Sequence, residues 1–567
     1  MNYQPKNLCF DQEGRERLVS GIEKIAKAVK STLGPRGNTV LIESNEHTHG
    51  ITVTKDGVTV ARSIALLDPV ENLAVRMVRE AADRTALSSG DGTTTAIVLT
   101  EAIVKEGLRL IEPHHNVTEV IRALNRRAEE VIESLDEQSI KVNQKKLQDV
   151  ATISANNDEA IGKVIADTYK KVGLKNGVVT VEKSQTSETT SEVTHGIQLD
   201  RGYTSPLFVN DQRRDECILE DVHVLVTDQE ISNLISVENV LKQIISEQKK
   251  LLIIGPCSQN VINTLAANVV RNGLKFCNII PPDFGFRKHE LMGDIALALG
   301  AKYFSEQTGD NIQFANYSDL GRAEKVIVGR DKTIIIRNDE KTEEINERVL
   351  ELEVQREEAK QKADKDFISK RIAGLQGAIG VIYVGGNSDL EQKELYDRVD
   401  DAVCAVKSAL EEGILPGGGV ALYEYSCIKI PLSVDNPPNP QVYRDNKDKE
   451  ISPEEAVALR IMRGAMKAPI EQILSNAGLN ADEILTPIKE KIEGFDKDGN
   501  RSAFPNPFQN NEGYDVKNHQ YGDMIEMGVV DPAKVTKNAL RNAVSVATTI
   551  LSTNAIVTLA RTYESGE

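Results

Sequence analysis

The sequence has no tryptophan, and aromatic residues make up only 4% of its 567 residues. Proteins that bind single-stranded nucleic acids stack the bases on exposed aromatic rings, which this chain supplies poorly. Positive charge is also in deficit, because 68 Lys and Arg stand against 86 Asp and Glu, for a formal net charge of −18. This charge argues against a nucleic-acid partner and favours solubility.

Long apolar segments are missing as well, since no run reaches the roughly 20 residues that a transmembrane helix needs. The N-terminus has neither an apolar signal core nor an Arg-rich presequence, so we expect a cytoplasmic protein without a membrane partner. The six cysteines are scattered and form no CxxC pair. We therefore expect structural thiols in a reducing compartment, with no cysteine metal site and no disulfide framework. Walker A, HExxH and GxSxG motifs do not occur, so P-loop, zincin and hydrolase functions lack support.

The length of the chain predicts about three domains. Residues 11–140 have mainly helical patterns, at 16–30, 71–87, 94–110 and 117–136, with strand-like pieces at 38–43 and 51–54. The middle alternates strands (177–181, 222–226, 251–255, 276–280) with helices (233–248, 258–271), which is typical of an α/β domain. A charged stretch at 339–376 favours a solvated helix pair. Helical patterns return after residue 400, which indicates one domain inserted into another.

The run Gly90–Thr95 is the most informative stretch for chemistry. Its two glycines permit close backbone approach, and its threonines open an apolar run, so their N–H and hydroxyl groups should lie at a helix N-terminus that favours anions. Asp91 suits a phosphate only with a cation between them, and Mg²⁺ is the natural bridge. A plain Gly-rich turn capped by threonine is the alternative. Two further glycine loops, Thr32–Asn38 and Gly417–Gly419, follow helical stretches and favour the nucleotide interpretation.

Seven motifs occur in the order found in group I chaperonins. They are Thr32–Gly37, Lys55–Gly57, Gly90–Thr95, Ser154–Asn156, Asp200–Tyr203, Gly417–Gly419 and Val530–Pro532. The chain resembles the GroEL type over nearly its whole length, with two polar segments beyond the family pattern, at 430–452 and 495–515. Each motif alone would be weak, whereas seven in one order are specific.

The resemblance implies a multidomain α and α/β fold with a mostly helical equatorial domain, a small intermediate domain and an inserted α/β apical domain. The expected segments are equatorial 1–140, intermediate 141–194, apical substrate-binding 195–378, intermediate 379–410 and equatorial 411–567. It also implies an ATPase that forms homo-oligomeric, seven-membered rings, captures unfolded proteins and releases them for folding. A passive holdase or structural ring with little ATP turnover is the alternative.

The resemblance also assigns site residues. Catalysis is assigned to Asp401, with Asp56 positioning the attacking water, and Mg²⁺ to Asp91. Lys55 lies where the family places a backbone contact to a monovalent cation, which favours K⁺. The ATP-binding set is Thr32, Leu33, Gly34, Pro35, Lys55, Gly92, Thr93, Thr94, Thr95, Gly418 and Asp531. Without the resemblance, each aspartate would more often be a helix cap or a salt-bridge partner.

For substrate binding, the resemblance points to Tyr203, Leu207 and Phe208, and to Val237 and Leu241 as the residues of the next helix that face the groove. Departures from the family pattern make this groove polar, because Glu238, Asn263, Ala267 and Asn268 stand where larger apolar residues are usual. Lost apolar contacts predict weakened or absent binding of a co-chaperonin lid. Such departures are typical of a chaperonin with few clients, and we relate them to a virus-encoded protein acting in its host's cytoplasm.

Overall fold

The computed structural model describes residues 6–43, 51–173, 178–212, 214–337, 342–359, 361–427, 443–444, 450–492 and 511–559. The chain divides into two compact units. One comprises Met1–Asp167, Val181–Thr190 and Tyr383–Glu567, and the other comprises Thr168–Thr180 and Ser191–Ile382. The first unit is therefore built from both ends of the chain, and the second lies between them in sequence, as the change in sequence pattern predicts.

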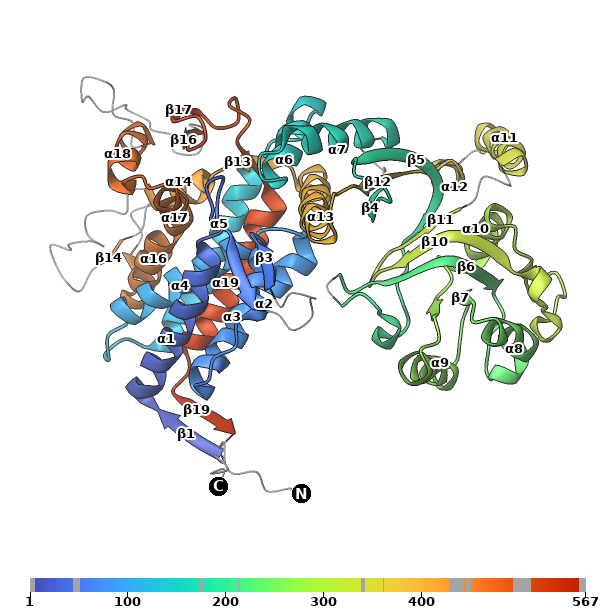
Figure 1. Cartoon of the computed structure of the whole chain (residues 1–567), viewed down its shortest axis with the longest axis horizontal. Helices are drawn as coiled ribbons and strands as arrows, with labels where there is room; N and C mark the ends of the chain where they lie inside the picture. Colours follow the sequence, from blue (N-terminus) through green and yellow to red (C-terminus); the bar gives the residue numbers. More distant parts are fainter. Residues whose placement is uncertain are drawn as a thin grey trace. The chain divides into compact units, whose positions relative to one another are not determined.

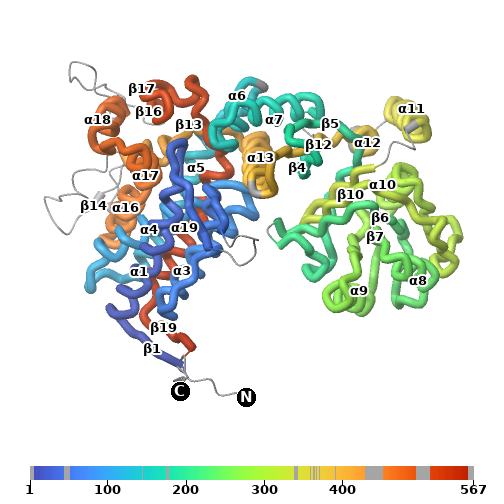
Figure 2. The backbone as a smooth tube through the Cα atoms, viewed as in Figure 1, coloured from blue at the N-terminus to red at the C-terminus, as the bar shows by residue number. Residues whose placement is uncertain are grey.

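The first unit is a bundle of long helices in which the two ends of the chain interleave (Figures 1 and 2). The C-terminal helix α19 packs on α3, α4 and α5, so its apolar face completes the same core. The bounds of the helices in the first unit are α1 Asp11–Lys30, α2 Gly57–Ser63, α3 Pro69–Ser89, α4 Thr93–Leu110, α5 Val117–Gln138, α6 Gln144–Ser154, α13 Asp389–Glu412, α14 Val420–Cys427, α16 Pro453–Met466, α17 Ala468–Asn476, α18 Ala481–Ile492 and α19 Ala533–Leu551.

Small antiparallel ribbons attach to this bundle. Each pairs two strands: β1 (Lys6–Phe10) with β19 (Ala555–Leu559), β2 (Val40–Glu43) with β3 (Ile51–Thr54), β13 (Ile414–Pro416) with β18 (Val530–Pro532), β14 (Tyr443–Arg444) with β15 (Glu450–Ile451), and β16 (Glu512–Asp515) with β17 (Gln520–Asp523). The β13–β18 pair sets Leu415 opposite Asp531. It thereby joins the glycine loop after β13 to the start of α19.

The second unit has a mixed sheet with helices packed on it. Its strands run β12-β5-β11-β10-β6-β7-β8, with β9 beside β6 and β4 beside β12. Helix α7 (Glu159–Val172) begins in the first unit and ends in the second. The bounds of the other elements are β4 Val178–Lys183, β5 Thr190–Leu199, η1 Pro206–Phe208, β6 Cys217–Thr227, η2 Leu234–Val237, α8 Glu238–Ser246, β7 Lys250–Ile254, α9 Gln259–Asn272, β8 Phe276–Ile279, α10 Gly285–Leu299, β9 Tyr303–Phe304, η3 Ile312–Phe314, η4 Tyr317–Asp319, β10 Gly321–Val328, β11 Thr333–Ile336, α11 Thr342–Glu358, α12 Lys362–Leu375 and β12 Ala378–Val384.

Local sequence explains most of these boundaries. Helix α3 begins where Asp68 caps it, with Pro69 in the first turn, and ends at Gly90. The predicted helix at 233–248 is wrong in one respect, because residues Leu234–Val237 form a 3₁₀ helix and the α-helix starts only at Glu238. The predicted helix pair at 339–376 is confirmed as α11 and α12, which pack on each other.

Two sequence predictions fall largely outside the described residues. Of the polar segment 430–452, only 443–444 and 450–452 are described, and of the segment 495–515, only 511–515. A separate intermediate domain stays a prediction, because the division into two units does not test it. Among the described residues, no helix is long and apolar enough to cross a membrane.

Candidate functional site

A cavity of about 350 Å³ in the first unit gathers the residues that the sequence assigned to a nucleotide. Its walls come from stretches of the chain that lie far apart in sequence, from Thr32 to Ala539. The predicted residues that line it are Thr32, Leu33, Gly34, Pro35, Lys55, Asp56, Asp91, Gly92, Thr93, Thr94, Thr95, Asp401, Gly418 and Asp531. The whole predicted set therefore shares one cavity, and the role of each residue stays a prediction.

The Gly-Asp-Gly turn between α3 and α4 forms one wall. Gly90 ends α3 with φ 73° and Gly92 precedes α4 with φ 85°, a left-handed conformation that side chains disfavour. Packing also requires glycine here, because a Cβ on Gly90 would lie 2.1 Å from Cβ of Cys404. Helix α4 then starts at Thr93, so its first N–H groups line the cavity and favour an anion there.

Two carboxylates on the cavity wall resist ionisation. Burial raises the pKa of Asp91, and the charge of Asp56 adds to this, whereas hydrogen bonds from Gly92 and Ser154 oppose it. Burial and the charge of Asp91 raise the pKa of Asp531 to about 7, although the Gly418 and Gly419 N–H groups donate to it. Ionising these two carboxylates therefore costs free energy, and a bound cation would reduce that cost.

Asp56 serves as the N-cap of α2. Its Oδ1 accepts from the Val58 N–H at 3.0 Å, and its Oδ2 accepts from the N–H of Thr59 at 3.0 Å and its hydroxyl at 2.6 Å. The cap interpretation of this aspartate thus has direct structural support, and the same contacts fix its carboxylate at the cavity wall. Lys55, which precedes it, is exposed and lines the cavity.

Asp401 lies on α13, one helical turn after Arg398, and both side chains line the cavity. Arg398 pairs with Glu394 and lies 4.0 Å from a carboxylate oxygen of Asp158. Glu394 and Asp397 line the cavity too, whereas Asp400 is not among its lining residues. The sequence prediction missed Glu394, Asp397 and Arg398, although their spacing from Asp401 on one helix was a signal for them.

Other wall residues had no signal in the sequence. Helix α17 supplies Ile470 and Ile473, and the β16–β17 ribbon supplies Tyr514 to Lys517. Of these, Ile470, Ile473, Tyr514 and Val516 give the cavity an apolar part together with Met524. Asn476 at the end of α17 donates to two carbonyl oxygens, of Lys30 and Leu33, both at 2.8 Å. These bonds tie α17 to the first glycine loop and position that loop at the cavity.

Removing the Asn476 amide should therefore loosen the Thr32–Pro35 loop. Asn476→Ala removes the side-chain donor to both carbonyl groups, of which, among the described residues, only that of Lys30 keeps a backbone donor, the Leu33 N–H. We therefore expect a loss of about 1–3 kcal/mol in the free energy of unfolding and a weaker affinity for ATP. Thermal unfolding with and without ATP measures both effects. Ser475→Ala is the control, because Ser475 is exposed on the same helix. Equal ATP affinity in the Asn476→Ala variant and the wild type would contradict the positioning role.

The charge of the cavity indicates what accompanies an anionic ligand. Seven acidic residues line the cavity, against the basic side chains of Lys55, Arg398 and Lys517. A nucleotide triphosphate would meet net repulsion unless a cation lay between it and the wall. Mg²⁺ fits this donor set, because it takes one or two carboxylates and completes its shell with phosphates and water. No cluster of three or more metal-ligating side chains occurs among the described residues.

The predicted client-binding residues lie in the second unit, and most of them are buried. Phe208, Val237 and Leu241 are 1%, 2% and 7% exposed and belong to the core. The prediction that Val237 and Leu241 face an open groove is therefore wrong for this conformation, because the apolar face of η2 and α8 packs on the domain core. Tyr203 is half-buried and its hydroxyl donates to Asp215 at 2.9 Å, whereas Leu207 is 54% exposed.

Comparison with known proteins agrees with this architecture. Two solved structures of the chaperonin gp146 from the bacteriophage EL 2 (Pseudomonas aeruginosa), both with ATP-BeFx, are similar to the chain. One has a TM-score of 0.64 at 23% identity and the other 0.59 at 22%, and each match covers 98% of this chain and 99% of the other. At this identity the likeness concerns the fold, and it confirms the predicted GroEL-type fold.

The match of the sequence to a family model identifies the family of the chain. Residues 25–561 match the model of the TCP-1/cpn60 chaperonin family, which spans nearly the whole chain. This match confirms the resemblance that the seven motifs indicated. The chain belongs to the TCP-1/cpn60 chaperonin family.

Proposed function

We propose that the protein is an ATP-dependent molecular chaperone, which binds and hydrolyses ATP in the cavity of the first unit. The observation that carries this proposal is the meeting of three features in one cavity: the N-terminus of α4, the carboxylate of Asp91 and the carboxylate of Asp401. Phosphoryl transfer needs phosphate donors, a metal ligand and a group that orients the attacking water. The crystallised gp146 chaperonin was likewise in presence of ATP-BeFx.

Each residue then has a defined task. Thr32, Gly34 and the Gly92–Thr95 turn hold phosphate oxygens, and Asp91 holds Mg²⁺ against them. Asp401 orients the attacking water, with Asp56 beside it, while Gly418 and Asp531 hold the nucleoside. K⁺ at the Lys55 carbonyl is the proposed second ion. When bound, Mg²⁺ supplies charge neutralisation at the phosphates, whereas the residues of the chain position the reacting groups.

Turnover then serves the capture and release of unfolded proteins by the second unit, and a co-chaperonin lid binds weakly or not at all. A passive holdase is the alternative function, and the presence of Asp56, Asp91 and Asp401 in one cavity disfavours it. Both related structures come from a bacteriophage, which supports a virus-encoded chaperonin acting in the host cytoplasm.

We further propose a homo-oligomeric ring of seven subunits. Two ribbons of the first unit carry exposed apolar side chains, with Leu41 72% and Val53 53% exposed on β2–β3, and Val557 57% and Leu559 54% on β1–β19. Exposed strand edges with apolar side chains are prone to pair with another chain. A second copy that covers these ribbons would remove the exposed edges and apolar surface.

Light scattering on the purified protein tests the ring. We expect a particle of seven or fourteen subunits of 62.3 kDa, and Leu41→Asp with Val557→Asp should shift it to the monomer, because a charge in a buried contact is costly. Leu87→Asp is the control, since Leu87 is equally exposed but lies on α3. A wild-type monomer with and without MgATP would contradict the ring and, with it, the folding chamber.

A further inference from the structure

Apart from Val270, the most exposed side chains of α9 are polar, and several of them bond along the helix. Gln259 donates to Asn263 at 3.0 Å, and Asn272 donates to Asn268 at 2.7 Å. Thr264 and Asn268 also bond back to carbonyl oxygens of the preceding turn. Amide groups that are paired in this way and solvated lose hydrogen bonds when an apolar chain covers them, so this face is poorly suited to an apolar ligand.

Exposed apolar side chains lie on two neighbouring 3₁₀ helices, and also at Phe284 and Phe286 at the start of α10. Ile235 on η2 is 77% exposed and Phe314 on η3 is 74% exposed, although both elements anchor in the domain core through Val237 and Ile312. The helices η2 and η3 pack against each other, so the two exposed side chains lie on adjacent elements. We call Ile235 and Phe314 the η2–η3 patch.

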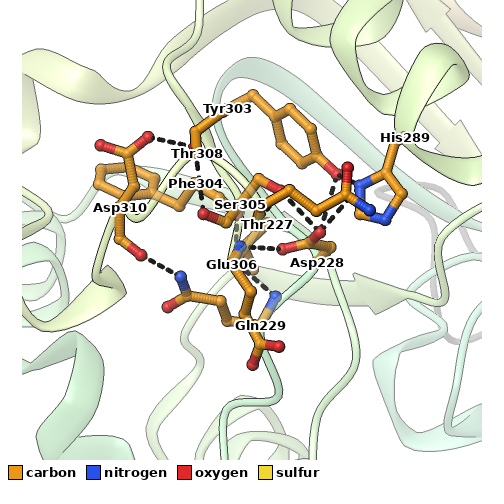
Figure 3. Close-up of polar contacts among 11 residues, drawn as sticks. Thr227, Asp228, Gln229, His289, Tyr303, Phe304, Ser305, Glu306, Thr308 and Asp310 are labelled. Atoms are coloured by element: carbon orange, nitrogen blue, oxygen red, sulfur yellow. Dashed lines mark hydrogen bonds and ion pairs between the residues drawn. The ribbon is translucent and has the colours of Figure 1, made fainter.

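A network of buried polar contacts holds the segment that leads into η3 (Figure 3). The Asp228 carboxylate, at the end of β6, accepts from the Ser305 hydroxyl at 2.9 Å, the Glu306 N–H at 3.1 Å and the Tyr303 hydroxyl at 3.1 Å. His289 Nδ1 lies 3.0 Å from the same carboxylate. The first residues of the segment, Ser305 and Glu306, are therefore held in place, since both donate hydrogen bonds to Asp228 at the end of β6.

The end of the same segment is fastened by Gln229. Its amide nitrogen donates to the Asp310 carbonyl, and its Oε1 accepts from the Ile312 N–H at 3.0 Å. The Thr308 hydroxyl, which donates to the Asp310 carboxylate at 2.7 Å, closes the turn between the two fixed ends (Figure 3). Phe314 thus projects from a pre-organised segment, and binding on it costs little ordering entropy.

Charge near the patch indicates its occupant. Glu230 precedes η2 and Glu306 lies in the segment before η3, and both are exposed. The nearby lysines are paired within the domain, Lys242 with Glu238 at 2.9 Å and Lys302 with Asp310 at 3.0 Å. No ion pair involves Glu230 or Glu306 in the part of the chain that the structure describes. An apolar surface with acidic neighbours is complementary to apolar side chains flanked by Lys or Arg.

We propose that the η2–η3 patch is a client-binding surface of this chaperonin, and that it binds apolar segments of unfolded polypeptides flanked by basic residues. This inference rests on the proposed function and adds to it the location and the chemistry of capture. Client binding thereby occurs beside α8, which packs against η2 and η3, rather than on the polar face of α9. Leu207, which is also exposed, lies on η1 and outside the patch.

Peptide binding by the full-length protein tests the proposal. The probe is a short fluorescein-labelled peptide of Leu, Phe, Ser and Lys, with a second peptide that has Glu in place of every Lys, and fluorescence anisotropy gives both affinities. We expect the wild type to prefer the basic peptide, and the double variant Ile235→Ser, Phe314→Ser to lose about tenfold in affinity or more, because both exposed apolar contacts are removed.

Val270→Ser is the matched control, since Val270 is 63% exposed on α9 and should change the affinity less than twofold. Unaltered ATP hydrolysis and melting temperature in all variants ensure that the fold is intact. Wild-type affinity in the double variant would contradict client binding at the η2–η3 patch and would not affect the proposed chaperone function. Preference of the wild type for the acidic peptide would contradict the proposal that client segments are flanked by basic residues. Absence of peptide binding by the wild type would overturn the patch and the client-binding function together.

Discussion

Asp401→Ala should bind ATP as the wild type does and hydrolyse it at least about 100-fold more slowly. A carboxylate that orients or deprotonates the attacking water contributes about 10²–10⁴-fold to such a reaction, and removing it leaves the phosphate and metal contacts intact. Asp401 lines the cavity from α13, whereas the phosphate turn and Asp91 belong to the loop before α4. Binding and hydrolysis are therefore expected to separate. Calorimetric titration with ATP and a phosphate-release assay measure the two quantities.

Asp400→Ala is the control, because Asp400 adjoins Asp401 on α13 but does not line the cavity. This variant should keep hydrolysis within about threefold of the wild type, as expected of a residue that does not touch the reacting groups. Parallel loss in both variants would mean that α13 has been destabilised. Normal hydrolysis and normal client release in Asp401→Ala would refute the assignment of this carboxylate and favour the passive holdase.

Local sequence determines the conformation of the Gly90–Thr95 turn, and this is why the sequence predicts it well. Gly90 and Gly92 take left-handed conformations, and the apolar run after Thr93 continues as a helix, so all the required signals lie within ten residues or so. Asn476 bonds to the backbone of Lys30 and Leu33, and the Tyr514–Lys517 segment lines the cavity, in both cases through tertiary packing. No local pattern distinguishes them from ordinary polar residues, and the sequence prediction missed them.

The second unit illustrates a different limit. Helical periodicity identifies which side chains share a face, but it does not say whether that face is covered. Val237 and Leu241 lie on the apolar face that the period predicts, and the sheet and its neighbours bury this face. The start of the segment is a 3₁₀ helix with three residues per turn, which changes the phase of the side chains. Ile235 consequently lies outside the core, although the sequence predicted one continuous helix over this segment.

Asp531→Asn should stabilise the nucleotide-free protein and weaken its affinity for ATP. The folded protein holds the pKa of Asp531 at about 7, against an ordinary value of 3.8. As pH rises from about 4 to about 7, the unfolded chain has already lost this proton while the folded chain retains it, so the wild type loses stability across that range. One pKa unit corresponds to about 1.4 kcal/mol, and the full cost above pH 7 is at most about 4 kcal/mol.

Asparagine has no charge to bury, so the stability of Asp531→Asn should exceed that of the wild type by an amount that grows up to about pH 7 and then stays constant. Chemical denaturation at pH 5, 6, 7 and 8 measures this difference. Asp482→Asn, on the exposed first turn of α18, should show no such trend. Stability curves for Asp531→Asn and the wild type that run parallel across this range would contradict the raised pKa.

The loss in ATP affinity has a separate origin. A hydrogen bond to a charged group contributes about 1.5–3 kcal/mol, so a nucleoside held by the Asp531 carboxylate should bind about 10- to 100-fold more weakly to the asparagine variant. Stability gained without ligand and affinity lost with it would identify Asp531 as a residue kept for binding at the expense of the fold. A variant that is more stable but binds ATP as tightly as the wild type would leave Asp531 buried beside the nucleotide without contacting it.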